Sequence, residues 1–423
     1  MSAPRIAELQ VERVVPGGAG LGRVDGVVAL VEGALPGDRV RAELVERQPG
    51  LLTGHALELL GAGPHRRGAI CPSALDRSCG GCDWPAARLE SHGELKTALV
   101  LDALKRTGRL PPEEIPAIRY LGSPFGYRLR NRFHLSEARL GFLAPRSHRV
   151  ADLSACELIS PALRDKLPEL ARLLAPAAPA ELVTLEGREG TPLLGELRAD
   201  HPVPDARALA SAAMGLLHGL RVRTPVETVT QGDTSLVIEA AGARFHVSVS
   251  SFFQGNRYLL DSFLEEVRAA LAACGEIRNA IDLYAGVGFL TRPLLETRAR
   301  LTAVEAEPSA AADLRRNLDE WRREGLPAAR AVEGTAEELL RGVRGADVVV
   351  LDPPRVGTSR TVRRELLRLA PRALVSISCD PATFARDASQ LLARYRLERL
   401  VLLDLFPGTH HVELLSVFLP RRT

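Results

Sequence analysis

Short apolar runs alternate with amphipathic segments throughout the C-terminal part of the chain. The predicted buried strands are 280–284, 301–305, 347–351 and 373–378. The segments between them have helical spacing, and strands that alternate with helices form a parallel sheet with helices on both faces. Two further apolar runs, 397–405 and 412–419, predict a closing pair of strands. Residues 251–423 are therefore expected to form a Rossmann-like α/β domain.

Residues 1–60 have a different pattern, in which short apolar runs are separated by glycine turns. The turns lie at 16–22 and 32–38. Short strands at this spacing are typical of a small antiparallel barrel related to the oligonucleotide-binding fold. A generic barrel or a protein-docking module would show the same turns, so the role of this region has to be inferred from the domains that come after it in the chain.

Residues 61–250 show no single repeating pattern and are expected to form a central α+β domain. A stretch rich in Gly, Pro and Cys covers 61–83, and a helix with one apolar side is predicted at 84–107. That side makes the helix a candidate for packing on the C-terminal domain. The rest of the region mixes predicted strands at 120–150, 235–240 and 245–249 with predicted helices at 161–174 and 205–217.

Composition and charge limit the class of protein. A chain of 423 residues is too long for one ordinary core, which agrees with several domains. The formal net charge of +3 is nearly balanced, so overall charge does not indicate a polyanionic partner. No signal-like apolar core or membrane-length run is present, and nothing indicates an obligate protein partner. A cytosolic protein is expected, with its six cysteines reduced, metal-bound or catalytic.

A glycine-rich turn follows the first predicted strand of the C-terminal domain. Asp282 lies in that strand, and Gly286 and Gly288 follow in the turn, where glycines let a ligand approach the backbone. A dinucleotide site would have a third glycine at position 291, which is Thr here. A methionine-derived nucleoside is therefore the better ligand. Glu305 ends the second strand, where a carboxylate accepts hydrogen bonds from ribose hydroxyls.

Three further segments place reactive side chains next to predicted strands. The segment 352–355, Asp-Pro-Pro-Arg, follows an apolar run, and its prolines stiffen a loop that holds Asp352 toward the same edge of the sheet. Cys379 directly follows the strand 373–378, in a loop position that favours a reactive thiol over an inert core cysteine. Glu413 is a candidate base, and a solvated glutamate at the rim of the site is its alternative.

The order and spacing of five segments resemble those of the RNA uracil-5-methyltransferase family. These segments are 251–256, 282–288, 352–355, 378–381 and 411–413. Residues 1–60 resemble the TRAM domain of RNA-modifying enzymes, so the resemblance covers nearly the whole chain. It implies a class I methyltransferase domain, S-adenosylmethionine as cofactor and structured RNA as partner. By residue, and with the glycine turn at Gly286, it implies cofactor contacts at Gln254, Tyr284, Glu305 and Asp352, a nucleophile at Cys379 and a base at Glu413.

The reaction of this family explains why a thiol and a base are needed. C5 of uracil is not nucleophilic enough to attack a sulfonium methyl group. Attack of a thiolate on C6 creates an enolate that takes the methyl group at C5, and a base then removes the C5 proton so that the thiolate leaves. One position departs from the family, because Thr335 stands where relatives often carry Asp or Asn near the adenine. The resemblance does not extend to that contact.

Four cysteines form a second group of candidate ligands: Cys71, Cys79, Cys82 and the distant Cys156. Structural zinc is the generic interpretation of four cysteines. Resemblance to the ribosomal-RNA branch of the family favours a [4Fe-4S] cluster instead, although the spacing from Cys71 to Cys79 is longer than usual there. The CxxxCxxC signature of radical enzymes is absent, so a structural or RNA-contacting role is expected.

A basic stretch between residues 119 and 149 is the candidate RNA-binding segment. It contains one acid, Glu137, and the arginines 119, 128, 130, 132, 139, 146 and 149, interleaved with Tyr127, Phe133 and Phe142. Basic side chains bind phosphates and aromatic rings stack on splayed bases, which suits single-stranded RNA. A solvated basic face of a sheet is the alternative.

Together these features predict methylation of uridine C5 in structured RNA, with 23S rRNA favoured over tRNA. Two alternatives stay open at this point. One is a tRNA uracil-5-methyltransferase. The other is a redox-sensing RNA-binding factor with an inactive methyltransferase fold, which would need neither Cys379 nor Glu413.

Overall fold

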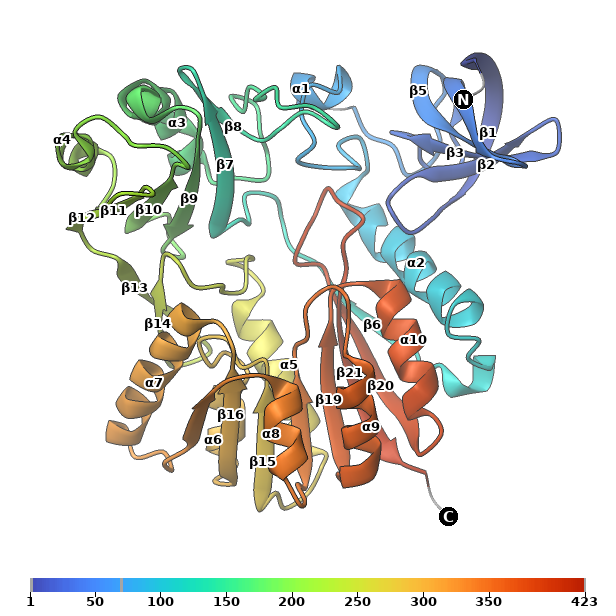
Figure 1. Ribbon diagram of the computed structural model, residues 1–423. Helices are drawn as coiled ribbons and strands as arrows, with labels where there is room; N and C mark the ends of the chain where they lie inside the picture. Colours follow the sequence, from blue (N-terminus) through green and yellow to red (C-terminus); the bar gives the residue numbers. More distant parts are fainter. Residues whose placement is uncertain (1–2, 69–70, 422–423) are drawn as a thin grey trace.

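An eight-stranded mixed sheet is the largest layer of the computed structural model, which describes residues 3–68 and 71–421 (Figure 1). Its strand order is β17-β16-β15-β18-β19-β21-β20-β6. The strands are β6 (Ile118–Leu121), β15 (Asn279–Leu283), β16 (Arg300–Glu305), β17 (Arg330–Glu333), β18 (Val348–Leu351), β19 (Ala373–Ser378), β20 (Tyr395–Leu403) and β21 (Glu413–Pro420). Strands β15 to β19 are parallel, whereas β21 is antiparallel to both β19 and β20. The predicted α/β fold is confirmed.

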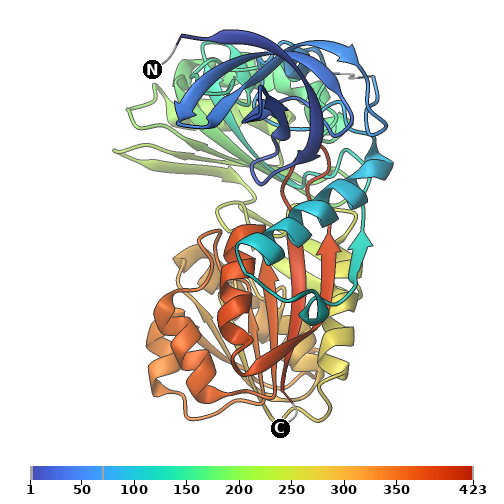
Figure 2. The ribbon, with the colours of Figure 1, turned by 90° about the vertical axis from the view of Figure 1, so that its right-hand side faces the viewer.

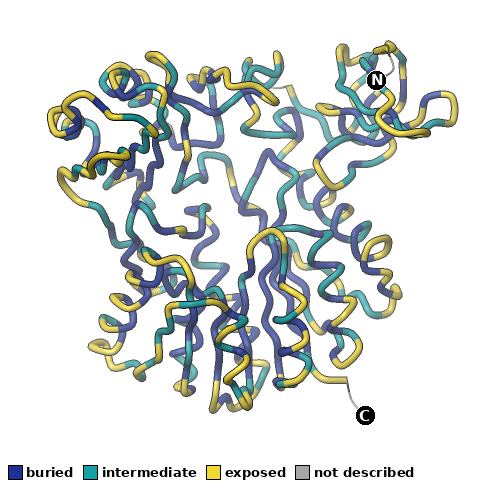
Figure 3. The backbone as a smooth tube through the Cα atoms, in the orientation of Figure 1, coloured by how far each residue is buried: buried dark blue, intermediate teal, exposed yellow. Residues whose placement is uncertain are grey.

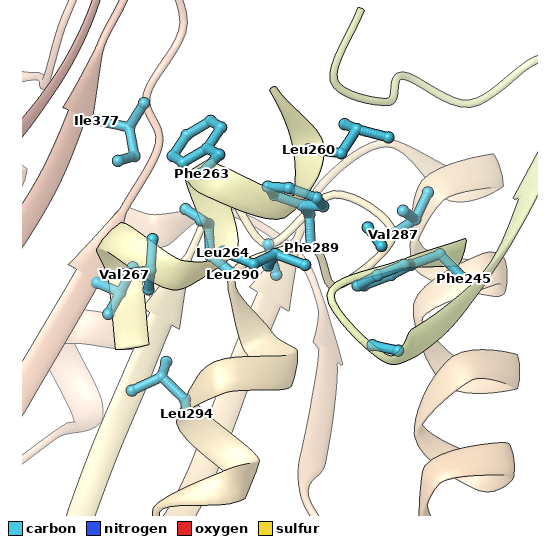
Figure 4. Packing of buried hydrophobic residues seen from close by; sticks show 14 of the residues in the cluster. Phe245, Leu260, Phe263, Leu264, Val267, Val287, Phe289, Leu290, Leu294 and Ile377 are labelled. Carbon is cyan, nitrogen blue, oxygen red and sulfur yellow. The ribbon is translucent and has the colours of Figure 1, made fainter. Parts of the chain in front are cut away.

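Helices cover both faces of this sheet, because successive side chains of a strand point to opposite sides. In β18, Val348 and Val350 pack into one apolar cluster, and Val349 and Leu351 pack into another. Figure 4 shows the first cluster, where Phe263 of α5 packs against Phe289, and Figure 3 shows the strands as buried. The covering helices are α2 (His92–Arg106), α5 (Leu260–Ala272), α6 (Thr291–Glu296), α7 (Pro308–Arg323), α8 (Ala336–Gly342), α9 (Arg360–Leu369) and α10 (Pro381–Leu391).

Three elements from earlier in the chain share the core of this C-terminal sheet. The helix α2 packs on α10, and β6 pairs in parallel with β20 at the edge of the sheet. The hairpin of β13 (Ser235–Ala240) and β14 (Ala243–Ser248) packs on α7. The division of the chain into 1–60, 61–250 and 251–423 stays a prediction. These elements precede the predicted boundary at 250 but pack with the part of the chain that follows it.

A closed barrel forms the N-terminal part of the protein. It consists of β1 (Arg5–Val14), β2 (Gly20–Val24), β3 (Val27–Glu32), β4 (Arg39–Gln48) and β5 (Leu51–Gly61). Its strands approach so closely that a Cβ on Gly54 would lie 1.7 Å from the carbonyl oxygen of Glu43, so only glycine fits there. Figure 2 shows the barrel above α2, and Trp84 joins them by donating a 2.8 Å hydrogen bond to the carbonyl of Gly18.

A six-stranded sheet forms the central region, with helices on one face. Its order is β12-β11-β10-β9-β7-β8. The strands are β7 (Arg130–Ser136), β8 (Arg139–Gly141), β9 (Ala180–Glu186), β10 (Leu193–Arg198), β11 (Gly219–Arg223) and β12 (Thr228–Gly232). An apolar cluster fixes α3 (Pro161–Leu174) and α4 (Ala206–Ala212) to one face of this sheet. The other face carries mainly polar side chains.

Short helical turns complete the described segments. They are α1 (Pro72–Leu75) and the 3-10 turns Leu89–Ser91, Pro112–Glu114, Ala175–Ala177 and Ala213–Gly215. Within residues 3–68 and 71–421, no helix has the length and apolar character needed to cross a membrane.

Candidate active site

The candidate active site lies where several strands of the C-terminal sheet end at one edge. The parallel strands β15, β16, β18 and β19 bring their carboxyl ends together, which is where open α/β sheets bind ligands. Glu305 ends β16, Asp352 follows β18 and Cys379 follows β19. Glu413 begins the antiparallel β21 at this same edge, since Ser378 of β19 pairs with Leu414.

The turn after β15 is held open by positive backbone angles. Tyr284, Gly286 and Gly288 have φ values of +62°, +55° and +99°, a region that favours glycine. The amide of Gly286 donates a 2.8 Å hydrogen bond to Oε2 of Glu305, which orients this carboxylate. A Cβ on Gly286 would meet no atom of the described residues within 4 Å. The turn therefore has open space above it for a ligand.

A buried carboxyl group, that of Asp282, lies in β15 just before this turn. Burial, together with Asp352 and Glu305, raises the pKa of Asp282 to about 7, although Thr291 donates a hydrogen bond to its Oδ2. The Oδ1 of Asp282 has no hydrogen-bond partner among the described residues. In the sequence, no role is assigned to Asp282 beyond its place in the segment 282–288. Its complete burial next to the turn indicates that it helps to shape the turn.

Asp352 and Gln254 meet although 98 positions separate them in the chain. The amide of Gln254 donates a 3.2 Å hydrogen bond to Oδ2 of Asp352. Burial and the nearby Glu305 carboxylate raise the pKa of Asp352 to about 7 despite that hydrogen bond. These two of the predicted cofactor contacts are thus neighbours. Another of them, Tyr284, has a phenol whose pKa burial and the charges of Glu337 and Asp387 raise to about 12.

The Glu413 carboxylate influences the Cys379 thiol electrostatically. Burial raises the pKa of the Cys379 thiol to about 12, and the carboxylates of Glu413 and Asp352 add to this effect. Burial and Asp352 raise the pKa of Glu413 well above its usual value, and its side chain is 5% exposed. A carboxylate in this environment binds a proton readily, which suits a general base. The solvated position considered for Glu413 is therefore wrong.

Arg355 is the cationic group of this edge. Its positive charge opposes the upward shift in the pKa of both Cys379 and Glu413. Arg355 belongs to a motif found in the sequence, but no role was predicted for it. It lies four residues after the end of β18 and three after Asp352, so its place in the same motif as a predicted cofactor contact was the available signal.

A buried polar network holds the loop that leads to Glu413, and sequence reasoning missed it. The ammonium of Lys96 in α2 donates hydrogen bonds to Oδ1 of Asp404 at 2.6 Å and to the carbonyl of His411 at 2.5 Å. The hydroxyl of Tyr120 donates to Oδ2 of Asp404 at 3.0 Å. Lys96 stands in the apolar half of a predicted helix, where a lysine needs a buried partner. The position of Lys96 in the sequence could therefore have predicted a buried acidic partner.

The four candidate metal ligands line one pocket. Cys71, Cys79, Cys82 and Cys156 surround it together with apolar side chains that include Phe125 and Phe142. Burial and the other cysteines raise the pKa of Cys82, and burial raises that of Cys79 to about 11. Among the described residues, no group of three or more potential ligands is arranged closely enough to hold a metal ion. The sulfur donors share a site, and the nature of a bound group stays a prediction.

The cysteine loop contacts the loop that leads to Glu413. Asp83, next to Cys82, accepts a 3.2 Å hydrogen bond from the amide of His410 and lies 2.7 Å from its Nδ1. The amide of Trp84 donates to the carbonyl of Gly408 at 2.9 Å. The candidate metal site and the candidate base are therefore joined by direct hydrogen bonds between their loops.

The predicted aromatic contacts to RNA in the basic stretch are wrong. Tyr127 and Phe133 are completely buried, and Phe142 is 8% exposed. Phe133 and Phe142 stack on each other in the core of the central sheet, because alternate side chains of β7 point toward the covering helices. These rings are not available to stack on bases. Arg130 and Arg132, which alternate with buried residues of β7 such as Phe133, point to the other face.

Thr335 has a structural role. Its hydroxyl accepts a 3.2 Å hydrogen bond from the amide of Glu338, and its own amide donates a 2.9 Å hydrogen bond to the Glu338 carboxylate. This reciprocal pair caps the N-terminus of α8. The Thr335 hydroxyl, at the position where relatives often carry Asp or Asn, is thus engaged in capping α8.

Comparison with known proteins identifies the family. A family described as tRNA (Uracil-5-)-methyltransferase matches residues 227–422, and the TRAM domain matches residues 5–57. A 23S rRNA (uracil(1939)-C(5))-methyltransferase, RlmD, of Halomonas elongata is 32% identical over 96% of this chain and 88% of its own. An uncharacterised RNA methyltransferase of Thermosynechococcus vestitus is 31% identical, with 97% of each chain covered.

A solved structure shares the fold over nearly the full length. It is the Pyrococcus abyssi tRNA (uracil-54, C5)-methyltransferase in complex with S-adenosyl-L-homocysteine, with a TM-score of 0.75 and 22% identity, covering 97% of this chain and 99% of that one. The two family matches contain most of the barrel, every strand of the eight-stranded sheet except β6, and the segments that carry Gln254, Glu305, Asp352, Cys379 and Glu413. The chain is an enzyme that belongs to the RNA uracil-5-methyltransferase family and carries an N-terminal TRAM domain.

Proposed function

We propose that this enzyme methylates C5 of a uridine in 23S rRNA through a covalent adduct between Cys379 and C6 of the base. The position of Glu413 beside Cys379 at the start of β21 is the observation that carries this proposal. Bound S-adenosylmethionine would supply the methyl group as an electrophile. Gln254, Glu305 and Asp352, with the turn at Gly286, would hold it at the sheet edge.

The two side chains would act at different stages. The sulfur of Cys379 forms a bond to C6, and the electrons of the C5–C6 double bond move to the C4 carbonyl as an enolate. C5 then bonds to the methyl carbon as that carbon leaves the sulfonium. Glu413 takes the C5 proton, the double bond re-forms and the bond from sulfur to C6 breaks. A raised pKa at Glu413 favours this proton transfer.

The thiol of Cys379, which is partly exposed, must first release its proton to solvent water. With its pKa at about 12, Cys379 is protonated at neutral pH in the free protein. Arg355 is the nearby charge that favours the thiolate. Protonation of Glu413 would also favour it, because the carboxylate charge would then be absent. The environment therefore links the ionisation of the nucleophile to that of the base.

Ribosomal RNA is favoured over tRNA as substrate by the full-length similarity to an RlmD protein. The similarity to the archaeal tRNA enzyme is below 25% identity and supports only the fold. A tRNA substrate stays the second candidate. The cytosolic location also stays a prediction.

A [4Fe-4S] cluster is proposed at the four cysteines, with zinc as the alternative. Four sulfur atoms around one pocket match the ligand set of such a cluster. Arg67 and Arg128 lie beside the pocket, where Arg128 donates to the carbonyl of Gly81 at 3.1 Å, and their charges suit an anionic cluster. Cys71, Cys79, Cys82 and Cys156 would hold it, and its role would be structural, since it lies beside the loop that leads to Glu413.

The test compares two variants and uses rRNA and tRNA from cells that lack the protein. With Cys379→Ala no enolate forms, so neither 5-methyluridine nor a protein-RNA adduct is expected. With Glu413→Gln the methyl group is transferred but the C5 proton stays, so a methylated adduct that survives denaturation should accumulate. Mass spectrometry measures both the 5-methyluridine in the RNA and the protein-RNA adduct for each variant. Normal turnover by Glu413→Gln, or 5-methyluridine from Cys379→Ala, would contradict the mechanism.

A further inference from the structure

One face of the six-stranded sheet carries arginines from three strands. Side chains on directly paired residues of neighbouring strands lie on the same face. One row of pairs contains Arg132, Val183, Glu196, Arg221 and Thr230. The next row contains His134, Glu181, Arg198, Arg223 and Thr228. We call Arg130, Arg132, Arg198, Arg221 and Arg223 the arginine face.

A single buried carboxylate organises this face. Glu196 is completely buried, and its carboxylate lies 2.5 Å from Arg198, 3.7 Å from Arg221 and 3.6 Å from Arg223. One carboxylate balances one positive charge, so three guanidinium groups around Glu196 leave an excess of positive charge. The side chain of Arg223 is 54% exposed. This excess is presented to solvent.

The remaining two arginines increase the excess. Arg132 is exposed. Burial and the charges of Arg132 and Arg198 lower the pKa of Arg130 to about 10, against the opposing charges of Glu196 and Glu307. Glu181, the other acid in these rows, lies 3.7 Å from His134. The face is therefore a dense cationic surface in a protein of nearly balanced net charge.

The arginine face continues into the candidate active site. Arg130 donates a 3.1 Å hydrogen bond to the carbonyl of Val249, and Arg221 donates a 2.8 Å hydrogen bond to the hydroxyl of Ser250. Four residues after Ser250, Gln254 contacts Asp352 at the sheet edge. One short segment thus touches the arginine face at one end and the candidate cofactor site at the other. A polymer bound at the site would meet this face next.

We propose that the arginine face binds the phosphate backbone of the RNA segment next to the target uridine. This inference rests on the proposed function, which supplies an RNA substrate at the adjoining site. Guanidinium groups recognise phosphate in bidentate geometry. The spread of charge over three strands suits a chain of phosphates rather than one anion. Because Tyr127, Phe133 and Phe142 are buried and offer no stacking surface, the face would contact backbone and not bases.

The test removes two charges without disturbing Glu196. Arg132→Gln with Arg223→Gln leaves Arg198 and Arg221 as partners of the buried carboxylate. Arg172→Gln with Arg207→Gln is the matched control, because both arginines are exposed on α3 and α4, which cover the opposite face of the same sheet. Both double variants lose the same charge. Thermal unfolding and S-adenosylmethionine affinity should match the wild type in both.

Binding of a fluorescent single-stranded oligouridine is measured at several salt concentrations. Two lost phosphate contacts should lower the slope of log K against log salt by about 1.4, at about 0.7 for each contact with a single strand. The variant of the arginine face should show this change and a higher KM for RNA, with kcat unchanged at saturation. The control variant should keep the slope of the wild type.

Two outcomes separate this inference from the proposed function. Equal slopes for both double variants would overturn the inference, even when the wild type makes 5-methyluridine in rRNA. Absence of 5-methyluridine from the wild-type reaction would contradict the proposed function instead. The salt slopes would still decide whether the arginine face binds RNA.

Discussion

The ammonium group of Lys96 lies 2.6 Å from Oδ1 of Asp404, and both side chains are completely buried. Burial alone would raise the pKa of Asp404, but the charge and hydrogen bond of Lys96, together with the nearby His92, outweigh burial and lower it. Lys96 also donates to the carbonyl of His411, two residues before Glu413. This pair therefore connects α2, from the first part of the chain, to the candidate base.

Replacing Lys96 with methionine should destabilise the protein by about 3–5 kcal/mol, because the buried Asp404 carboxylate would lose its ammonium partner and keep only Tyr120 and His92 beside it. The loop at 404–413 should also lose protection from hydrogen exchange. Lys105→Met is the control, since Lys105 is exposed on the same helix, and surface substitutions usually change stability by about 0.5 kcal/mol or less. Equal melting and exchange in the two variants would show that the pair does not hold the loop.

The pH at which Cys379 reacts should depend on Glu413. After burial, the Glu413 carboxylate is the largest influence that raises the pKa of this thiol to about 12. Glu413→Gln removes that negative charge, so the pKa should fall and alkylation by iodoacetamide should begin at lower pH. Mass spectrometry of the Cys379 peptide measures the shift.

Cys274 serves as an internal control in the same digests. Burial raises the pKa of its thiol and Arg372 opposes the shift, without a contribution from Glu413. Its alkylation profile should be the same in both proteins. An unchanged profile at Cys379 would mean that the two side chains do not interact in solution.

Glu305→Gln should weaken binding of S-adenosylmethionine about 10-fold to 100-fold, the effect of losing a hydrogen bond to a charged group worth about 1.5–3 kcal/mol. Glu333→Gln is a matched control, because Glu333 pairs directly with Glu305 in the sheet but forms an ion pair with Arg315. Calorimetry measures both affinities. A similar loss of S-adenosylmethionine affinity in the two variants would argue against a ribose contact at Glu305.

Protein purified without oxygen should be brown and absorb broadly in the visible range, as cysteine-bound iron-sulfur clusters do. Cys79→Ser or Cys82→Ser should remove the colour. Cys274→Ser should keep it, since Cys274 packs against the apolar cluster that contains α5, away from the pocket. A colourless protein with an equimolar amount of zinc would favour the zinc alternative.

Much of the C-terminal domain was predictable because its signals are local. Strand β19 is apolar along most of its length, and a polar loop comes directly after it. A parallel strand covered on both faces has to look like this, since neither side of it meets water. Cys379 and Asp352 could be placed at one edge for the same reason, because carboxyl ends of parallel strands coincide.

The basic stretch shows where local reasoning fails. Arginines are interleaved with aromatic residues between 119 and 149, and this pattern suggested one binding surface. Alternation in a strand separates two faces, so Phe133 lies in the core and Arg132 faces solvent. The arginines that accompany Arg132 come from β10 and β11, which only the pairing register brings alongside.

The sequence by itself determined the strands, the glycine turn and the types of reactive side chain, because periodicity and turn chemistry act over a few residues. Tertiary structure alone decided which distant groups meet. Lys96 and Asp404 are 308 positions apart, and Gln254 and Asp352 are 98 apart. Such contacts depend on how helices and strands pack around a shared core, and packing is a property of the whole chain rather than of any segment.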